Sequence, residues 1–384
     1  MTATQVSARR RAKGMVWVPG GAFAMGSEQF YPEERPVRRV EVDAFWIDDH
    51  PVTVAEFRRF VKATGYVTIA ERPLDPAQYP DADPALLRPG SLVFYQADRP
   101  VDLRDVSQWW RYTPGANWRR PRGPGSTLDG LDTHPVTHVA AEDADAYAAW
   151  AGKELPTEAE WELAARGGLD GATFTWGDDP APKGKAMANT WQGEFPWQNL
   201  KPPRKQGTSA VKSYPPNGFG LYDMAGNVWE WTSDFYAAPA AARACCAPRN
   251  PRVTSATGSL APGQPGARIP RRVIKGGSHL CAPSYCLRYR PAARQGEAVD
   301  TSTAHLGFRC IVRELSPAEL KTSNPVELTN RCFTRPPRDP RPPTRATPAS
   351  RRSTQGLRRP AASGDNTVYR TGRSASGVRS AIVG

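Results

Sequence analysis

The sequence contains no run of about 18 consecutive apolar residues, the length that a membrane-spanning helix needs. A basic stretch occupies residues 9–13, but the apolar segment after it is short and is broken by Pro19, Gly20 and Gly21. Such a segment does not form the core of a secretory signal peptide. The sequence therefore predicts no contact with a membrane and a cytoplasmic location, where stable disulfides are not expected.

Histidine is scarce, and acidic residues are almost missing from the end of the chain. The five histidines are scattered, and they are His50, His134, His138, His279 and His305. From Arg331 onward there are twelve Arg but only two acids, Asp339 and Asp365. This tail carries most of the formal net charge of +13, so the rest of the chain is close to neutral.

The arginine-rich tail would attract nucleic acid only through its charge, because no pattern of stacking aromatics is interleaved with its arginines. Residues 335–384 also have almost no large apolar side chains with which to bury surface. We therefore expect no specific nucleic-acid binding. We assign residues 1–13 and 315–384 to disordered ends and residues 14–314 to one domain.

The sequence is rich in residues that favour loops and irregular cores. It contains 12 Trp, 39 Pro and 33 Gly, which favour a loop-rich protein, with polar partners for the indole N–H groups, over a helical bundle. No internal repeat is visible. The prediction is a single α+β domain with little regular secondary structure.

Few regular elements are predicted within this domain. Residues 15–18 and 22–25 should form a β-hairpin around a glycine turn, and residues 37–47 should form another strand. Residues 70–130, rich in Pro, Asp and Arg, should form a long surface excursion. Helices are predicted from apolar spacing and capping residues at 54–64, 141–151 and 157–166.

The most informative segment holds two cysteines, Cys281 and Cys286, in a Gly- and Pro-rich loop with arginines nearby. Such a pair could be a disulfide or two unrelated thiols, and no further ligands stand at the spacing of a zinc site. Nearby arginines would lower the pKa values of the thiols. If the pair binds a metal, two sulfur ligands suit a soft monovalent ion, with Cu(I) first.

This segment resembles the active-site region of formylglycine-generating enzymes, and the resemblance covers about residues 14–314 in the order of that family. The matching segments are residues 17–21, 25–27, 50–53, 134–136, 155–162, 189–196, 220–231, 276–294 and 306–310. The implied fold is a single loop-rich domain of the formylglycine-generating enzyme type, similar to C-type lectins. Many of these segments mark the wider sulfatase-modifying factor superfamily, whereas the cysteine pair separates its oxidases from the other members.

The resemblance implies copper- and O2-dependent oxidation of a sulfatase cysteine, in a Cys-x-Pro-x-Arg segment, to formylglycine. Cys281 and Cys286 would bind Cu(I), the substrate cysteine would add a third sulfur, and O2 would react at the metal. Ser278 matches a serine that helps to place substrate or oxygen, and Trp229 and Tyr285 match pocket residues. The implied partner is an unfolded or nascent sulfatase chain that binds in extended form.

The resemblance also implies structural Ca2+ bound by oxygen ligands. One site would use two side chains and two backbone carbonyls, those of Asp223, Glu230, Gly226 and Val228. A second site would use Asn189 and the carbonyl of Thr190 together with a later carboxylate. Residues 201–205 read Lys-Pro-Pro-Arg-Lys at that place, so this carboxylate is missing.

Two other enzyme or binding classes stay open. An iron-dependent sulfoxide synthase of the same superfamily would need a histidine-rich helical domain, and no such domain precedes residue 14. A non-catalytic binding module would be favoured by the loss of either cysteine of the pair, and both are present.

The remaining cysteines carry less information. The resemblance implies that Cys310 is a buried free thiol, because Ala165 stands where secretory relatives have its disulfide partner. Cys245 and Cys246 have no assigned role.

Overall fold

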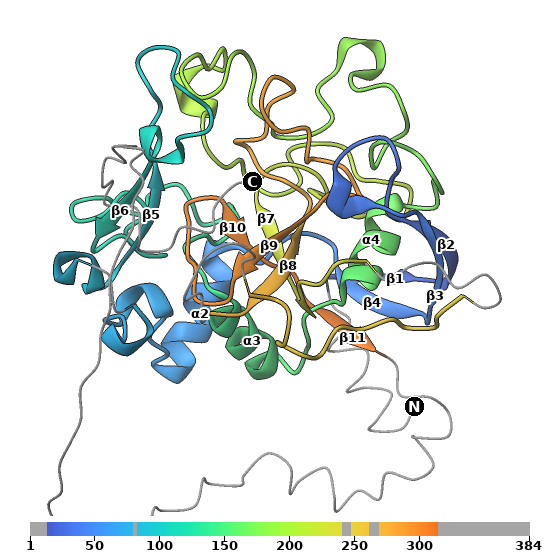
Figure 1. Cartoon of the computed structure of the whole chain (residues 1–384), viewed down its shortest axis with the longest axis horizontal. Coiled ribbons are helices and arrows are strands. Elements are labelled where there is room, and N and C mark those ends of the chain that lie inside the picture. Colours follow the sequence, from blue (N-terminus) through green and yellow to red (C-terminus); the bar gives the residue numbers. More distant parts are fainter. Residues whose placement is uncertain (1–13, 80–82, 240–246, 261–268, 314–384) are drawn as a thin grey trace, which may run out of the picture. The chain divides into compact units, whose positions relative to one another are not determined.

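The computed structural model describes residues 14–79, 83–239, 247–260 and 269–313 (Figure 1). All of these residues belong to one compact unit. The predicted disordered ends, residues 1–13 and 315–384, lie outside the described residues, as do Cys245 and Cys246. The domain boundaries near residues 14 and 314 therefore stay a prediction.

Regular elements are short, and loops connect them over most of the described chain. The α-helices are α2 (Val54–Thr64), α3 (Ala141–Trp150) and α4 (Glu158–Arg166). The strands are β1 (Met15–Val18), β2 (Gly21–Met25), β3 (Arg38–Val42), β4 (Phe45–Asp48), β5 (Gly90–Phe94), β6 (Trp110–Pro114), β7 (Trp229–Phe235), β8 (Arg271–Lys275), β9 (Arg294–Ala298), β10 (Leu306–Gly307) and β11 (Ile311–Arg313). Short 3-10 helices are η1 (Pro32–Glu34), η2 (Ile69–Glu71), η3 (Pro76–Gln78), η4 (Pro84–Leu87), η5 (Val106–Gln108), η6 (Pro182–Gly184) and η7 (Pro203–Lys205). The predicted loop-rich α+β class is confirmed.

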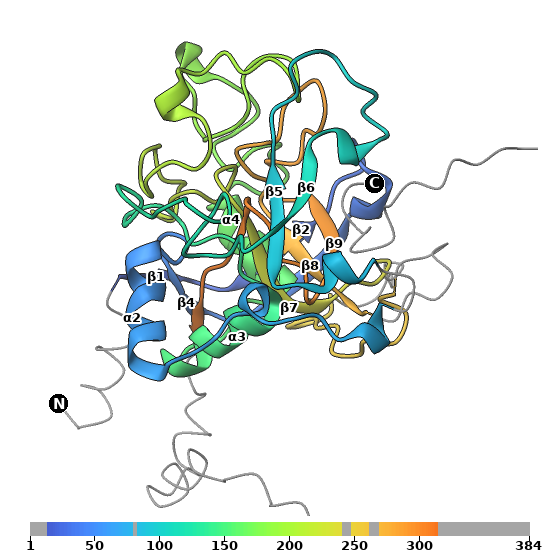
Figure 2. The same cartoon turned by 90° about the vertical axis from the view of Figure 1, so that its left-hand side faces the viewer.

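The strands form small sheets rather than one continuous sheet. The largest has the order β10-β7-β8-β9, in which β10 runs parallel to β7 and the other pairs are antiparallel. A second sheet has the order β1-β4-β11, so that the last described strand pairs with one near the start of the chain. The hairpins β2-β3 and β5-β6 complete the set, and β5 and β6 lie side by side in Figure 2.

The predicted hairpin between residues 15–18 and 22–25 is wrong. β1 pairs with β4, and β2 pairs with β3. A Cβ atom on Gly20 would lie 2.6 Å from the backbone of Val42 and Ala44, so this glycine permits a close crossing of two chain segments instead of a hairpin turn. The predicted strand 37–47 is divided at the same crossing into β3 and β4.

The predicted helices are confirmed, and their ends have clear chemical causes. Thr53 and Thr157 accept hydrogen bonds from backbone N–H groups at the starts of α2 and α4, and a glutamate three residues later completes each capping box. Gly65 and Gly167 end these helices in the left-handed conformation. Within the described residues, no helix combines the length and the apolar character that crossing a membrane requires.

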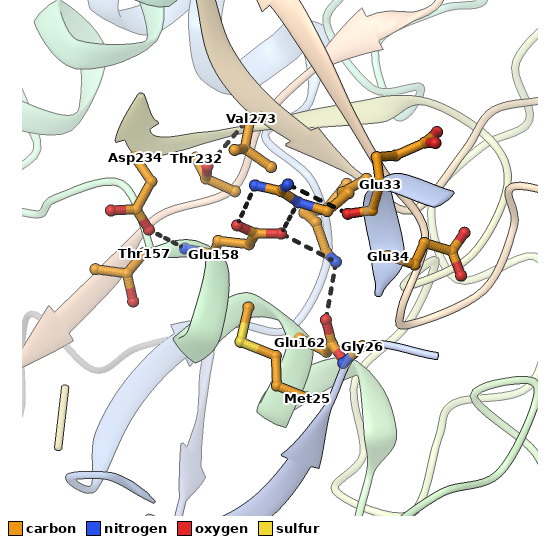
Figure 3. Close-up of polar contacts among 12 residues, drawn as sticks. Met25, Gly26, Glu33, Glu34, Thr157, Glu158, Glu162, Thr232, Asp234 and Val273 are labelled. Atoms are coloured by element: carbon orange, nitrogen blue, oxygen red, sulfur yellow. Dashed lines mark hydrogen bonds and ion pairs between the residues drawn. The ribbon is translucent and has the colours of Figure 1, made fainter. Parts of the chain in front are cut away.

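Helix α4 contacts β2, β3, β7 and β8, and all nine of its residues are buried, including Glu158 and Glu162. Figure 3 shows the polar contacts around these two carboxylates. Buried carboxylates are costly unless they are paired. Arg294 of β9 donates two hydrogen bonds to Glu158, at 2.6 and 2.9 Å, and Lys275 of β8 lies 3.0 Å from Glu162. Although burial disfavours its charge, Lys275 and Arg166 lower the pKa of Glu162 to about 2. These two buried carboxylates of α4 are therefore paired with cations.

The segment at residues 70–130 is more than the predicted surface excursion. It contains the β5-β6 hairpin, and Trp109 and Trp118 are fully buried within it. Trp109 packs edge-to-face on Phe195 at 5.4 Å between ring centres. Part of this segment therefore forms a wall of the core, because its aromatic side chains outweigh its polar composition.

Candidate functional site

Gly276 and Gly277 bring the two ends of the cysteine loop together. Their φ angles are 93° and 67°. A Cβ atom on Gly277 would lie 2.9 Å from the backbone of Arg288, and one on Gly276 would lie 3.0 Å from the ring of Trp161. Only glycine fits both the positive φ and the close approach. The loop at residues 278–287 is thus closed at its base, directly after β8.

The sulfurs of Cys281 and Cys286 are in contact within this loop. Their Sγ atoms lie 3.0 Å apart, and both cysteines are free thiols. Burial disfavours a Cys281 thiolate, but the S–H of Cys286, the N–H of Ser278 and the nearby Arg288 outweigh it and lower the pKa of Cys281. The pKa of Cys286 is raised well above its usual value, because Cys281 accepts its hydrogen bond and because it is buried. The arrangement favours a thiolate on Cys281 beside a thiol on Cys286.

A small cavity of about 30 Å³ lies beside the sulfurs. The structure brings all five predicted catalytic and pocket residues to its lining, namely Cys281, Cys286, Ser278, Trp229 and Tyr285. The Ser278 hydroxyl oxygen accepts the N–H of Leu280 at 3.2 Å, which fixes the side chain in the loop. The cavity has room for more than one water-sized group, because a single water needs roughly 10–15 Å³.

Other lining residues were missed by sequence reasoning, and they are Trp109, Trp110, Phe195, Leu280, Arg288, Gln295 and His305. Three buried polar atoms on the lining lack a hydrogen-bond partner in the described part of the chain: Nε1 of Trp109, Oη of Tyr285 and Nδ1 of His305. Buried polar groups are normally satisfied. These atoms therefore favour a polar ligand or water in this cavity. The adjacent tryptophans 109 and 110, in an otherwise polar segment, were the signal that could have found this wall.

Two glutamates of η1 form ion pairs with the arginines that follow the cysteine loop. Arg288 donates to Glu33 at 2.5 Å, and its guanidinium lies 3.9 Å from the ring centre of Tyr31. Arg290 makes a bidentate ion pair with Glu34, with N–O distances of 2.6 and 2.9 Å, and both side chains are almost fully buried. These partners are about 255 residues apart in sequence, and no local pattern predicts them.

The donor atoms of the cysteine pair fit the predicted Cu(I). Two adjacent sulfurs, one of them favoured as a thiolate, are soft ligands, and soft ligands select a soft ion. Within the described residues no group of three or more His, Cys, Asp or Glu side chains could hold a metal. A low-coordinate site built from two sulfurs is therefore consistent with the side chains present.

In the first predicted calcium set, Glu230 forms an ion pair with an arginine, whereas Asp223 accepts hydrogen bonds from neutral donors. Glu230 accepts hydrogen bonds from Arg309 at 2.7 and 2.8 Å, and both side chains are fully buried. Asp223 is 8% exposed and accepts from the backbone N–H of Lys212 at 2.8 Å and the amide of Asn227 at 3.3 Å. Burial raises the pKa of Asp223. A buried carboxylate with neutral donors favours a cation, so the Asp223 end of the set fits Ca2+.

The second predicted calcium set does not fit a metal ion. The ammonium of Lys201 donates a hydrogen bond to Oδ1 of Asn189, the side-chain oxygen that would face the ion. A divalent ion there would be repelled by this buried positive charge. We derive no role for calcium at Asn189 and Thr190. The remaining cysteine expectation is confirmed, since Cys310 is a fully buried free thiol.

Several known proteins are similar to this chain in sequence or in fold. The chain matches the sulfatase-modifying factor enzyme 1-like domain over residues 2–314. It is 53% identical over 306 residues to the formylglycine-generating enzyme of Mycobacterium tuberculosis, covering 79% of this chain and 98% of that protein. It is 46% identical over 307 residues to the formylglycine-generating enzyme of Thermomonospora curvata, covering 78% and 93%. The solved structure of PvdO from Pseudomonas aeruginosa aligns with a TM-score of 0.50 and 25% identity, covering 78% of this chain and 94% of that one.

The fold and the site define a loop-rich α+β protein with a thiol pair on the wall of a small pocket. The chain belongs to the sulfatase-modifying factor family, together with the formylglycine-generating enzymes named above. The family resemblance predicted from the sequence is confirmed.

Proposed function

We propose that the chain is a copper- and O2-dependent oxidase that converts the cysteine of a Cys-x-Pro-x-Arg segment in a sulfatase into formylglycine. The observation that carries the proposal is the pair of sulfurs 3.0 Å apart on the wall of a cavity that also holds unpartnered polar atoms. The similarity to formylglycine-generating enzymes, which this chain matches over almost their whole length, supports the same reaction.

The net reaction balances with an added reductant. The substrate CH2–SH group and O2, together with two electrons and two protons from a thiol reductant, give an aldehyde, hydrogen sulfide and water. In the net reaction the C–S bond and one C–H bond of the substrate and the O–O bond are broken, and a C=O bond, one S–H bond and two O–H bonds are formed. A Cu(I) ion held by the two cysteines would supply the redox centre for the reduction of O2.

The chain's own residues prepare this chemistry. Cys281 and Cys286 would hold the ion, and the cation of Arg288 stabilises the Cys281 thiolate. The rings of Trp229 and Tyr285 line the cavity, so they limit the access of water to the reacting sulfur. The Ser278 hydroxyl lies on the same lining and can orient the substrate thiol or oxygen.

The direct test uses the purified, copper-loaded chain, a thiol reductant, O2 and a peptide that contains Cys-x-Pro-x-Arg. We expect a product whose mass shows the loss of sulfur and the gain of a carbonyl oxygen, and which reacts with an aldehyde-specific hydrazide. A peptide with alanine in place of the cysteine should give no product. Failure of the copper-loaded chain to convert the cysteine peptide would overturn the proposed reaction.

The sulfatase partner is proposed to bind as an unfolded or nascent chain in the cytoplasm. The small cavity admits a side chain rather than a folded surface, so the substrate cysteine must be presented on an extended segment. A folded sulfatase with the same sequence should therefore react more slowly than its denatured form, which the mass measurement can compare.

Calcium is expected to stabilise the fold through Asp223 and the carbonyls of Gly226 and Val228, while Glu230 keeps its ion pair with Arg309. Removing calcium with a chelator is expected to lower the free energy of unfolding by about 2–4 kcal/mol, the effect of a ligand at 100–1,000 times its Kd. Urea unfolding with and without calcium measures this difference. In Asp223→Asn the two curves should coincide. A chelator effect that persists in this variant would place the ion elsewhere.

A further inference from the structure

Lys201 is a buried ammonium with an uncommon environment. Its residue is 7% exposed, and Nζ donates to Oδ1 of Asn189. In the described part of the chain no carboxylate acts on its charge, and burial alone lowers the pKa of Lys201 to about 8. Lysine is almost never buried without a charged partner, because the loss of hydration is costly. The contacts of the Lys201 ammonium must therefore stabilise the fold enough to offset the cost of burying its charge.

Lys201 contacts the side-chain oxygen of Asn189, a residue that joins two other segments of the chain by hydrogen bonds. Asn189 donates through its side-chain amide to the carbonyl of Gly207 at 3.0 Å and to Oδ1 of Asn227 at 3.3 Å. Its carbonyl accepts the backbone N–H of Asn227 at 2.8 Å. The carbonyl of Lys201 itself accepts from the side chain of Gln206 at 3.0 Å. Asn189 therefore ties both ends of the loop at residues 189–207 to the segment just before β7, and Lys201 holds Asn189 from within the loop.

This loop forms part of the wall of the cysteine cavity. The N–H of Trp191 donates to the carbonyl of Cys281 at 2.9 Å. The ring of Phe195 stacks on Tyr285 at 4.4 Å between ring centres and packs on Trp191 at 5.3 Å. A change in the path of the loop would move these rings and the carbonyl contact of Cys281 together. The anchor of the loop is thus also an anchor of the cavity.

We propose that the Lys201 ammonium is a built-in cation that holds the loop at residues 189–207, and with it the Trp191 and Phe195 side of the cysteine cavity, in place of a bound metal ion. A tethered ammonium offers three N–H donors to amide and carbonyl oxygens. It keeps the loop in place at any concentration of free calcium, because the cation is part of the chain. Lys201 is a positioning residue and does not line the cavity.

The test compares Lys201→Met with Lys205→Met in the full chain at saturating calcium. The methionine keeps the length of the side chain and removes the charge, and Lys205 is an exposed lysine of the same loop. Hydrogen exchange should be at least about tenfold faster in peptides from residues 189–207 of Lys201→Met, whereas Lys205→Met should match the wild type. Exchange in Lys201→Met within twofold of the wild type overturns the proposal.

A kinetic readout separates positioning from a general loss of stability. In Lys201→Met the KM for the Cys-x-Pro-x-Arg peptide should rise several-fold, because the cavity wall is displaced in every molecule. A lowered kcat at the wild-type KM would indicate only a smaller folded fraction and would overturn the positioning role. The hydrogen-exchange result needs no turnover, so it stands or falls independently of the proposed oxidation.

Discussion

Replacing Cys281 or Cys286 with serine is expected to lower formylglycine formation by at least about a thousandfold, the size of effect seen when a group that acts as part of a catalytic unit is removed. Serine keeps the shape of the side chain but is a hard oxygen donor, which does not suit a soft ion. The two single variants and the double variant should lose activity to a similar degree, because each leaves an incomplete pair. Product is measured from the peptide mass spectrum.

Cys310→Ala is the matched control for the loss of a thiol. Cys310 is buried and free, and it does not line the cavity beside the cysteine pair. This variant should keep the wild-type KM and a kcat within about twofold of wild type. Activity that persists in Cys281→Ser, or that is lost equally in Cys310→Ala, would contradict the role of the pair.

Lys275→Met is expected to lower the free energy of unfolding by about 3–5 kcal/mol, the cost of breaking a buried ion pair from one side. Lys275 is fully buried, 3.0 Å from Glu162 and 3.8 Å from Glu158. Its removal leaves two buried carboxylates that share the remaining cations of the network. Urea unfolding followed by tryptophan fluorescence should show a lower midpoint with an unchanged m-value.

Lys185→Met is the matched control for this change, because Lys185 is exposed. Its unfolding curve should overlay that of the wild type within about 0.5 kcal/mol. A Lys275→Met protein with wild-type stability would mean that Lys275 does not stabilise the ionic network.

Glu162 gives the stability a pH dependence, because its pKa is lowered to about 2 in the folded state. Its contribution to the free energy of unfolding is present above its unfolded pKa and is lost as the pH falls toward 2.

Local patterns predicted the parts of the fold that local chemistry decides. The capping threonines and terminal glycines of α2 and α4 act within one helical turn, so the sequence could place both helices. The glycine at position 20 was misread because a turn and a close crossing both require glycine. Only the neighbouring backbone, which lies about 22 residues away in sequence, distinguishes them.

In the candidate site, too, the sequence predicted the residues of one continuous segment but not the contacts between distant segments. Its cysteines and Ser278 come from one continuous loop, which made them recognisable. The cavity wall at Trp109 and the ion pair of Glu33 with Arg288 come from distant segments, whose meeting depends on tertiary packing. Lys201 could be read from the sequence only as a missing carboxylate. That the lysine itself supplies the cation required its contact with Asn189 to be seen.

The pairing of β11 with β4, and of Arg290 with Glu34, sets a condition on biosynthesis. The residues that support the thiol pair come from both ends of the domain, so the pocket cannot assemble while the ribosome still holds the last hundred residues. An enzyme proposed to act on growing chains must therefore itself be synthesised through β11 before it can work on one. Truncation within β11 should therefore leave helices α2, α3 and α4 able to form but no competent pocket.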